Sequence, residues 1–274
     1  MSAGNSGLLL VSGRNTTSDG ITPCEKLKRL STPQSVAIVT VGTWELCADL
    51  KLNEIINGDC LGGMRSDIPD ESIDLIVTDP PYLVSYKTNH RKNKDHKFCK
   101  EIKNDNNPDL ISDYIKECYR ILKPNSAMYM FCSCVHIDQF MQMAKEAGFN
   151  IKNNIVWVKN NWTAGDLKAA FGRQHEYILL LNKGRKIFHG KRITDVWHFD
   201  RVTGKNQVHQ NQKPVELIKQ CIEYHSDEGD IVFDGFMGSG TTAVAARETG
   251  RNFVGYELDK EYWSVAVDRL SDMR

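Results

Sequence analysis

The sequence predicts an α/β protein with a doubly wound, mostly parallel β-sheet. From Ile55 onward, short apolar runs alternate with stretches that repeat apolar residues at helical spacing, the pattern of strands connected by helices. A glycine-rich turn also joins an apolar run to a helical stretch near the end of the chain. With 274 residues, 41% hydrophobic and 26% charged, the chain can bury one large core.

The individual elements follow from these runs. The predicted strands are Ile55-Ile56, Ile73–Thr78, Ala127–Phe131, Ile155–Val158, Tyr177–Leu181, Ile231–Phe233 and Phe253–Gly255. The predicted helices are Leu110–Leu122, Ile137–Ala147, Val215–Tyr224, Thr241–Thr249 and Lys260–Leu270. In the first helix, Tyr114, Cys118 and Ile121 recur at helical spacing, and Pro124 lies just after its end.

Composition sets limits on the class of protein. Residues 1–48 are predicted to be an N-terminal extension of uncertain order, and residues 49–274 one large domain. No apolar run approaches the roughly 18 to 20 residues that cross a bilayer, so we expect a cytoplasmic protein without a membrane partner. The eight cysteines include no C-x-x-C pair, which predicts reduced thiols and no metal site. A net charge of zero counts mildly against a nucleic-acid-binding protein, but an average can hide local basic patches.

The strand Ile73–Thr78 runs into Asp79-Pro80-Pro81-Tyr82, which carries a carboxylate, two prolines and an aromatic ring. In open α/β sheets, ligands bind beyond the carboxyl ends of strands, where this tetrapeptide lies. The prolines fix φ and remove two backbone donors, which leaves carbonyl oxygens free to accept hydrogen bonds. Asp79 and the Pro80 carbonyl can accept both N–H groups of an aromatic amine while Tyr82 stacks on its ring. The alternative interpretation is a turn with a surface tyrosine.

A second segment, Asp234 to Thr241, joins a predicted strand to a helix through a glycine-rich turn. Gly238 and Gly240 allow a ligand to approach the backbone closely, and the helix N-terminus favours a carboxylate or phosphate. Glu257 follows the next strand and is placed to bond a ribose diol. The pattern itself fits both a dinucleotide and S-adenosylmethionine. Only one helix follows Glu257, so the other strands lie upstream, the sheet is circularly permuted, and S-adenosylmethionine is favoured.

In this order of motifs, the chain resembles the beta group of DNA amino-methyltransferases over about residues 52–272. That family places a D-P-P-Y segment before a target-recognition region and an F-x-G-x-G cofactor loop last, as Phe236 to Gly240 stands here. Further similar segments are Asn57-Gly58-Asp59-Cys60, His209-Gln210-Asn211-Gln212-Lys213-Pro214 and Phe253-Val254-Gly255-Tyr256-Glu257. Gln210 and Asn211 depart from the family's usual Pro-Thr, and residues 1–45 match no family segment.

The resemblance implies a circularly permuted Rossmann-like methyltransferase fold for residues 49–274, with a small target-recognition insertion at about residues 159–208. It makes Asp79, Pro80, Pro81 and Tyr82 the catalytic segment. The implied cofactor is S-adenosylmethionine, released as S-adenosylhomocysteine, without a metal. The residues that would bind it are Asp59, Cys60, Asp79, Lys213, Asp234, Phe236, Gly238, Ser239, Gly240, Thr241 and Glu257.

Two basic stretches, Lys87–Lys103 and Lys183–Lys205, are candidate phosphate contacts. Taken alone each fits a solvated loop, but beside a pocket for a flipped base they predict a clamp on DNA. We expect Lys87–Lys103 to become ordered only on DNA, and Trp162 and Trp197 to reach bases. The predicted DNA-binding residues are Lys87, Arg91, Lys92, Lys94, Arg173, His175, Lys191, Arg192 and Arg201.

The function that the resemblance implies is site-specific methylation of the adenine N6 amine in double-stranded DNA, by base flipping. A homodimer and a cognate restriction enzyme are further candidate partners, the second within a restriction-modification system. Cytosine-N4 methylation is the nearest alternative, but the family's cytosine members usually carry S-P-P-Y, so Asp79 favours adenine. Methylation of RNA is a weaker alternative. A DNA-binding regulator on an inactive methyltransferase scaffold is disfavoured by the intact D-P-P-Y segment and glycine loop.

Overall fold

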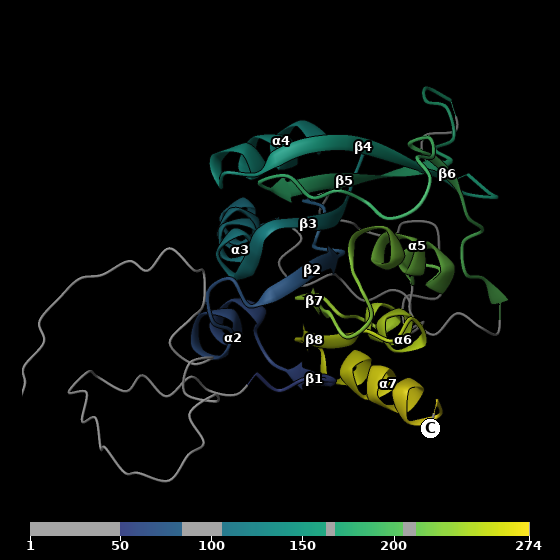
Figure 1. Cartoon of the computed structure of the whole chain (residues 1–274). Coiled ribbons are helices and arrows are strands. Elements are labelled where there is room, and N and C mark those ends of the chain that lie inside the picture. The colour runs from purple at the N-terminus through teal and green to yellow at the C-terminus, as the bar shows by residue number, and fades with distance from the viewer. Residues whose placement is uncertain (1–49, 84–105, 163–167, 205–211, 274) are drawn as a thin grey trace, which may run out of the picture. The chain divides into compact units, whose positions relative to one another are not determined.

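The computed structural model describes residues 50–83, 106–162, 168–204 and 212–273. Its centre is an eight-stranded sheet in the order β1-β8-β7-β2-β3-β5-β4-β6 (Figure 1). The strands are β1 (Glu54–Asn57), β2 (Ile73–Thr78), β3 (Leu122–Cys132), β4 (Asn150–Val158), β5 (His175–Lys183), β6 (Val196–His198), β7 (Ile231–Asp234) and β8 (Asn252–Glu257). Only β5 among these strands runs antiparallel to its neighbours, which confirms the mostly parallel sheet.

The strand order shows the circular permutation. The last two strands of the chain, β7 and β8, lie between β1 and β2, and both pair with their neighbours in parallel. The half of the sheet that carries the glycine-rich turn is therefore built from the end of the chain. It stands directly beside the strand that leads into Asp79, which brings the two motifs to one edge of the sheet.

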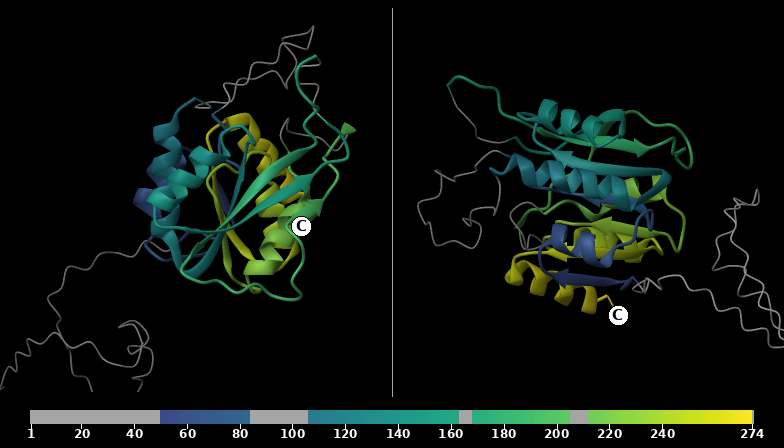
Figure 2. Two further views of the ribbon diagram at one scale, coloured as in Figure 1. Left: turned by 90° about the horizontal axis from the view of Figure 1, so that it is seen from above. Right: turned by 90° about the vertical axis from the view of Figure 1, so that its left-hand side faces the viewer.

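Helices cover both faces of the sheet (Figures 1 and 2). One face carries α2 (Cys60–Asp67), α3 (Pro108–Ile121) and α4 (Ile137–Glu146), and the other carries α5 (Val215–His225), α6 (Thr241–Glu248) and α7 (Lys260–Ser271). Successive strand residues point to opposite faces, so Val77 belongs to one buried cluster and Ile76 to the other. In the part of the chain described, no helix is both long enough and apolar enough to span a membrane.

Helix α3 illustrates how the sequence specifies its elements. The side chain of Asn107 accepts a hydrogen bond from the Leu110 amide at 3.2 Å, and Pro108 occupies the first turn, where its missing N–H costs nothing. The apolar residues at helical spacing, Tyr114 and Cys118 among them, are fully buried against the sheet. The predicted helix is confirmed, beginning two residues earlier than expected and ending at Ile121.

Every predicted strand and helix is present: β2 has the predicted bounds, and the bounds of the others differ by up to five residues. Two short elements within the described residues were missed. Helix α2 is only eight residues long and contains Gly62 and Gly63, which disfavour a helix. Gly63 is needed because a Cβ there would lie 2.2 Å from the ring of Tyr256. Strand β6 has three residues, too few for a visible alternation.

The region predicted for target recognition, residues 159–208, is not a continuous insertion. Strand β5 lies within it, between β3 and β4 in the sheet, and its residues Ile178 to Asn182 are buried. The described segments of this range that lie outside the sheet are residues 159–162, 168–174, 184–195 and 199–204. Trp197, expected to reach bases, is instead 7% exposed, and its Nε1 donates to the Thr194 carbonyl at 2.9 Å.

Candidate active site

The predicted catalytic and cofactor segments meet at one edge of the sheet. Asp79 follows β2, the glycine-rich turn follows β7, Glu257 ends β8, and Asp59 lies just beyond β1. These four strands are neighbours and parallel, so their carboxyl ends share an edge. The structure thus brings together residues that are as far apart in sequence as Asp59 and Glu257.

The glycine-rich turn has a backbone conformation that favours glycine at two positions. Gly238 and Gly240 adopt φ angles of 55° and 80°, which residues other than glycine rarely adopt. The Gly238 amide donates to Glu257 Oε2 at 2.8 Å, which connects the turn to the end of β8. A Cβ at Gly238 would meet only the Phe236 carbonyl, at 4.0 Å, and one at Gly58 nothing within 4 Å. The backbone at Gly238, and at Gly58 beyond β1, therefore leaves room for a ligand.

Hydrogen bonds to Asp234 hold the start of this turn in place. Its side chain is 3% exposed and accepts hydrogen bonds from Thr78 Oγ1 at 3.0 Å, Thr242 Oγ1 at 2.7 Å and the Phe236 amide at 3.0 Å. Burial raises the pKa of this carboxyl to about 6, although these three hydrogen bonds oppose the rise. The geometry gives Asp234 the task of shaping the cofactor turn, with both carboxylate oxygens already bonded by the chain itself.

The rest of the turn is held from two sides. Phe236 packs edge-on against Tyr114, with ring centroids 4.7 Å apart. Arg269 on α7 donates to the Ser239 carbonyl at 2.5 Å and to Thr241 Oγ1 at 3.5 Å. Arg269 was not predicted, because its position in the last turn of an ordinary amphipathic helix carries no motif. Ser239 and Thr241 are both buried, so their side chains support the turn.

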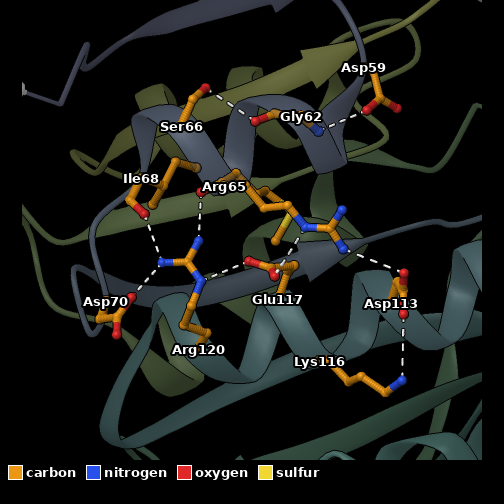
Figure 3. A network of polar contacts seen from close by, with 11 residues as sticks. Asp59, Gly62, Arg65, Ser66, Ile68, Asp70, Asp113, Lys116, Glu117 and Arg120 are labelled. Atoms are coloured by element: carbon orange, nitrogen blue, oxygen red, sulfur yellow. Dashed lines mark hydrogen bonds and ion pairs between the residues drawn. The ribbon is translucent and has the colours of Figure 1, made fainter.

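Asp59 begins α2, and its Oδ2 accepts from the Gly62 amide at 2.8 Å. The helix is fixed to α3 by the network in Figure 3, in which Arg120 donates to the Met64 carbonyl at 2.6 Å and to the Ile68 carbonyl at 3.0 Å. These bonds satisfy carbonyls at the end of α2. Cys60 was predicted to bind the cofactor, but its thiol is buried in the core, and burial raises its pKa to about 12.

At the catalytic segment, both oxygens of Asp79 carry hydrogen bonds. Tyr82 Oη donates to Asp79 Oδ1 at 2.5 Å, and Lys213 Nζ lies 2.7 Å from Asp79 Oδ2. Burial raises the pKa of Asp79 above its ordinary value, although the Lys213 ammonium opposes this. Burial would lower the pKa of Lys213, but its carboxylate neighbours raise it. Pro80 and Pro81, which follow Asp79, are both buried.

Two residues that sequence reasoning missed complete the site. Glu176 Oε2 lies 3.3 Å from Lys213 Nζ and 3.3 Å from Tyr82 Oη, and its Oε1 forms an ion pair with Lys159. Burial alone would raise the pKa of Glu176, but the ammonium groups of Lys213 and Lys159 lower it to about 2. Lys159 directly follows β4, Glu176 is the second residue of β5, and neither belongs to a motif, so only the fold identifies them.

The predicted DNA contacts are only partly visible. Lys87, Arg91, Lys92 and Lys94 lie outside the described residues. Arg173, Lys191 and Arg192 are exposed, whereas His175 and Arg201 are half-buried. Among the five described residues of this set, His175 is next to the site, because it precedes Glu176 at the start of β5. Trp162, also expected to reach bases, is 69% exposed. Among the described residues, no cluster of His, Cys, Asp and Glu side chains could hold a metal ion.

Fold and site together define a class of protein: an α/β enzyme with a glycine-rich turn suited to a nucleoside cofactor, next to a partly buried carboxylate that can accept an amine. The DNA methylase family profile matches residues 73–268. Type II methyltransferase M.HinfI of Haemophilus influenzae is 30% identical over 81% of this chain and 69% of its own length, and DNA adenine methyltransferase YhdJ of Escherichia coli strain K12 is 32% identical over 79% and 82%.

A solved structure agrees with these relatives. The crystal structure of the M1.HpyAVI-SAM complex is 28% identical, covers 79% of this chain and 98% of its own, and superposes with a TM-score of 0.62. The chain therefore belongs to the DNA methylase family. This confirms the resemblance to the DNA amino-methyltransferases and the Rossmann-like methyltransferase fold that the sequence predicted.

Proposed function

We propose that this enzyme transfers a methyl group from S-adenosylmethionine to the exocyclic N6 amine of adenine in double-stranded DNA. The observation that carries the proposal is the position of Asp79 and the glycine-rich turn at the ends of the adjacent strands β2 and β7. An acceptor for an amine thus lies next to a site suited to a nucleoside cofactor. The target base must be flipped out of the duplex to reach Asp79.

The residues of the turn fit this cofactor. Its amino acid part would lie along the turn at Gly238, where the backbone is open, and its ribose hydroxyls would bond to Glu257. Asp59, just past β1, would contact the adenosine end. When bound, the cofactor supplies an electrophilic methyl group on its sulfonium. The individual roles of these residues remain predictions.

The amine of adenine is a poor nucleophile because its lone pair is delocalised into the ring. Asp79 and the Pro80 carbonyl would accept its two N–H groups and so orient the lone pair toward the methyl group. The amine must take the place of the Tyr82 hydroxyl, which donates to Asp79 Oδ1 in the free protein. Tyr82 would then be released to stack on the base. After transfer, Asp79 is the nearest group to accept the proton that the methylated nitrogen loses.

Two observations favour adenine over cytosine as the target. The catalytic segment begins with Asp79, not with the serine usual in cytosine-N4 enzymes of this family. A relative that is 32% identical is named as a DNA adenine methyltransferase. A cytoplasmic location, a homodimer and a cognate restriction enzyme stay predictions. Sedimentation would test the homodimer.

The proposal is tested by expressing the chain in a bacterial host that has no adenine methylation of its own. Genomic DNA from this host is then sequenced by a method that detects modified bases. We expect N6-methyladenine at a defined sequence with the wild-type chain and none with Asp79→Ala. Modified cytosine alone, or no modified base from a well-expressed soluble protein, contradicts the proposal.

A further inference from the structure

We propose that Glu176 is a positioning residue for methyl transfer, which together with Lys159 holds Lys213 and thereby sets the place and hydrogen-bonding capacity of Asp79. This inference rests on the proposed function, because it concerns the same site. Glu176 does not touch the glycine-rich turn in any described contact. It acts on the reacting amine through Lys213 and Asp79.

The fold explains how Glu176 reaches the site. In a parallel sheet, only the carboxyl ends of strands meet at the active edge, but β5 runs antiparallel to β3 and β4. Its first residues therefore lie at that edge, with Val158 paired to His175 and Cys132 paired to Tyr177. Glu176 stands between these two pairs. Strand β5, the one antiparallel strand among those described, thus places a carboxylate where the other strands end.

The four charged groups form a chain of alternating sign: Lys159, Glu176, Lys213 and Asp79. Lys159 pairs with Glu176 Oε1, Lys213 lies 3.3 Å from Glu176 Oε2, and Asp79 Oδ2 lies 2.7 Å from Lys213. Their side chains are 14%, 22%, 8% and 25% exposed, respectively. Charges this far from water need partners, since an unpaired one would cost several kcal/mol. Lys213 also lies over the Phe131 ring, 5.0 Å from its centroid, which limits its other positions.

Lys213 shares its ammonium group between Glu176 and Asp79, and this affects how strongly Asp79 can accept a hydrogen bond from the amine. If Glu176 were neutral, Lys213 would give its charge to Asp79 alone, and Asp79 would accept an amine N–H less strongly. The titratable groups that face Asp79 are Lys213, Tyr82, Glu176, Asp234 and the Cys132 thiol, whose pKa burial raises to about 12. Lys213 lowers the pKa of Asp79, whereas burial and the Glu176 anion raise it. Loss of the Glu176 charge should therefore lower the pKa of Asp79.

The test compares three variants in the full chain. Glu176→Gln removes the charge but keeps the shape of the side chain. Asp74→Asn is the matched control, because Asp74 is a carboxylate 17% exposed, paired with Lys123 at 2.5 Å, at the opposite end of β2. The double variant Lys159→Met/Glu176→Gln removes one charge of each sign. Each is measured for single-turnover methyl transfer to DNA, for unfolding in urea, and for the pKa of Asp79 in the free protein from its carboxylate ¹³C resonance.

We expect Glu176→Gln to transfer methyl groups about 10-fold to 100-fold more slowly, as misplacement of a reacting group does, and to titrate Asp79 at lower pH. Asp74→Asn should keep its rate within about twofold, because its site is independent. The double variant should regain stability without regaining rate, since Lys159, a partly buried charge that Glu176→Gln leaves without its carboxylate partner, is no longer present, but the hold on Lys213 is still missing.

Three outcomes would overturn the proposal: an unchanged rate in Glu176→Gln, an unchanged Asp79 titration, or recovery of the rate together with stability in the double variant. The last would mean that Glu176 only stabilises the fold. If the wild-type chain methylates no DNA, the proposed function fails, and the titration of Asp79 alone then decides whether Glu176 sets its state.

Discussion

Asp234→Asn should make the stability of the protein less dependent on pH. The carboxyl of Asp234 has an ordinary pKa of 3.8 and, because of burial, a folded-state pKa of about 6. The folded chain thus binds this proton more tightly than the unfolded chain does. The contribution to stability is fully present below about pH 3.8 and is lost as the pH rises through about 6. The difference of about 2 between the two pKa values corresponds to about 3 kcal/mol in the free energy of unfolding.

The structure indicates that asparagine can replace the protonated acid. Its Oδ1 can accept from Thr78 Oγ1 and the Phe236 amide, as Asp234 Oδ1 does at 3.0 Å each. Its Nδ2 can donate to Thr242 Oγ1, whose hydroxyl rotates to accept. The cofactor turn should therefore keep its shape, without a buried negative charge.

The assay is urea unfolding of both proteins at a series of pH values, with Asp268→Asn on the exposed face of α7 as a control for the loss of one negative charge. From about pH 4 to about pH 7.5, the free energy of unfolding of Asp234→Asn minus that of wild type should rise by roughly 2 kcal/mol, and it should level off above about pH 7. A difference that stays constant within about 0.5 kcal/mol would refute the argument, because Asp234 would then not titrate in this range.

Three further predictions concern the catalytic and binding segments. Asp79→Ala should bind S-adenosylhomocysteine almost as wild type does in calorimetry but lose methyl transfer by at least about 1000-fold; residual activity within about tenfold would remove Asp79 from catalysis. Gly240→Ala should lower the free energy of unfolding by about 1 to 3 kcal/mol in urea, because φ is 80° there and the new Cβ would lie 2.9 Å from Ala266 Cβ; unchanged stability would contradict this. A triple variant of the basic stretch carries alanine at Arg91, Lys92 and Lys94. It should bind all DNA sequences more weakly, and the salt dependence of its binding should flatten by roughly one unit of slope per lost phosphate contact. An unchanged slope would count against the clamp on DNA.

The central sheet and its permutation could be predicted because they depend on local signals. Apolar runs such as Ile73–Thr78 leave little choice of element, and the position of the Gly238 turn near the C-terminus determines which strands must come first. The antiparallel direction of β5 has no such signal. Its apolar run, Tyr177–Leu181, reads the same in either direction, and pairing alone decides it.

The candidate site likewise contains residues that the sequence could predict and residues that it could not. Asp79, Gly238 and Glu257 stand in motifs with fixed spacing, so the sequence indicates both their identity and their chemistry. Lys159 and Glu176 are 17 residues apart, and they meet only because β4 and β5 form a hairpin. The sequence also led to the wrong role for Trp197, which was expected to reach bases, since a large aromatic side chain can pack in a core as well as stack on a base.

The most direct test of the account is the chemical identity of the product. The purified chain is incubated with S-adenosylmethionine that carries a deuterated methyl group and with unmethylated genomic DNA, which is then digested to nucleosides for mass spectrometry. The account predicts N6-methyldeoxyadenosine that carries the deuterated methyl group, formed by the wild-type chain and lost in Asp79→Ala. The label on cytosine N4, or on adenine equally in both proteins, would contradict it.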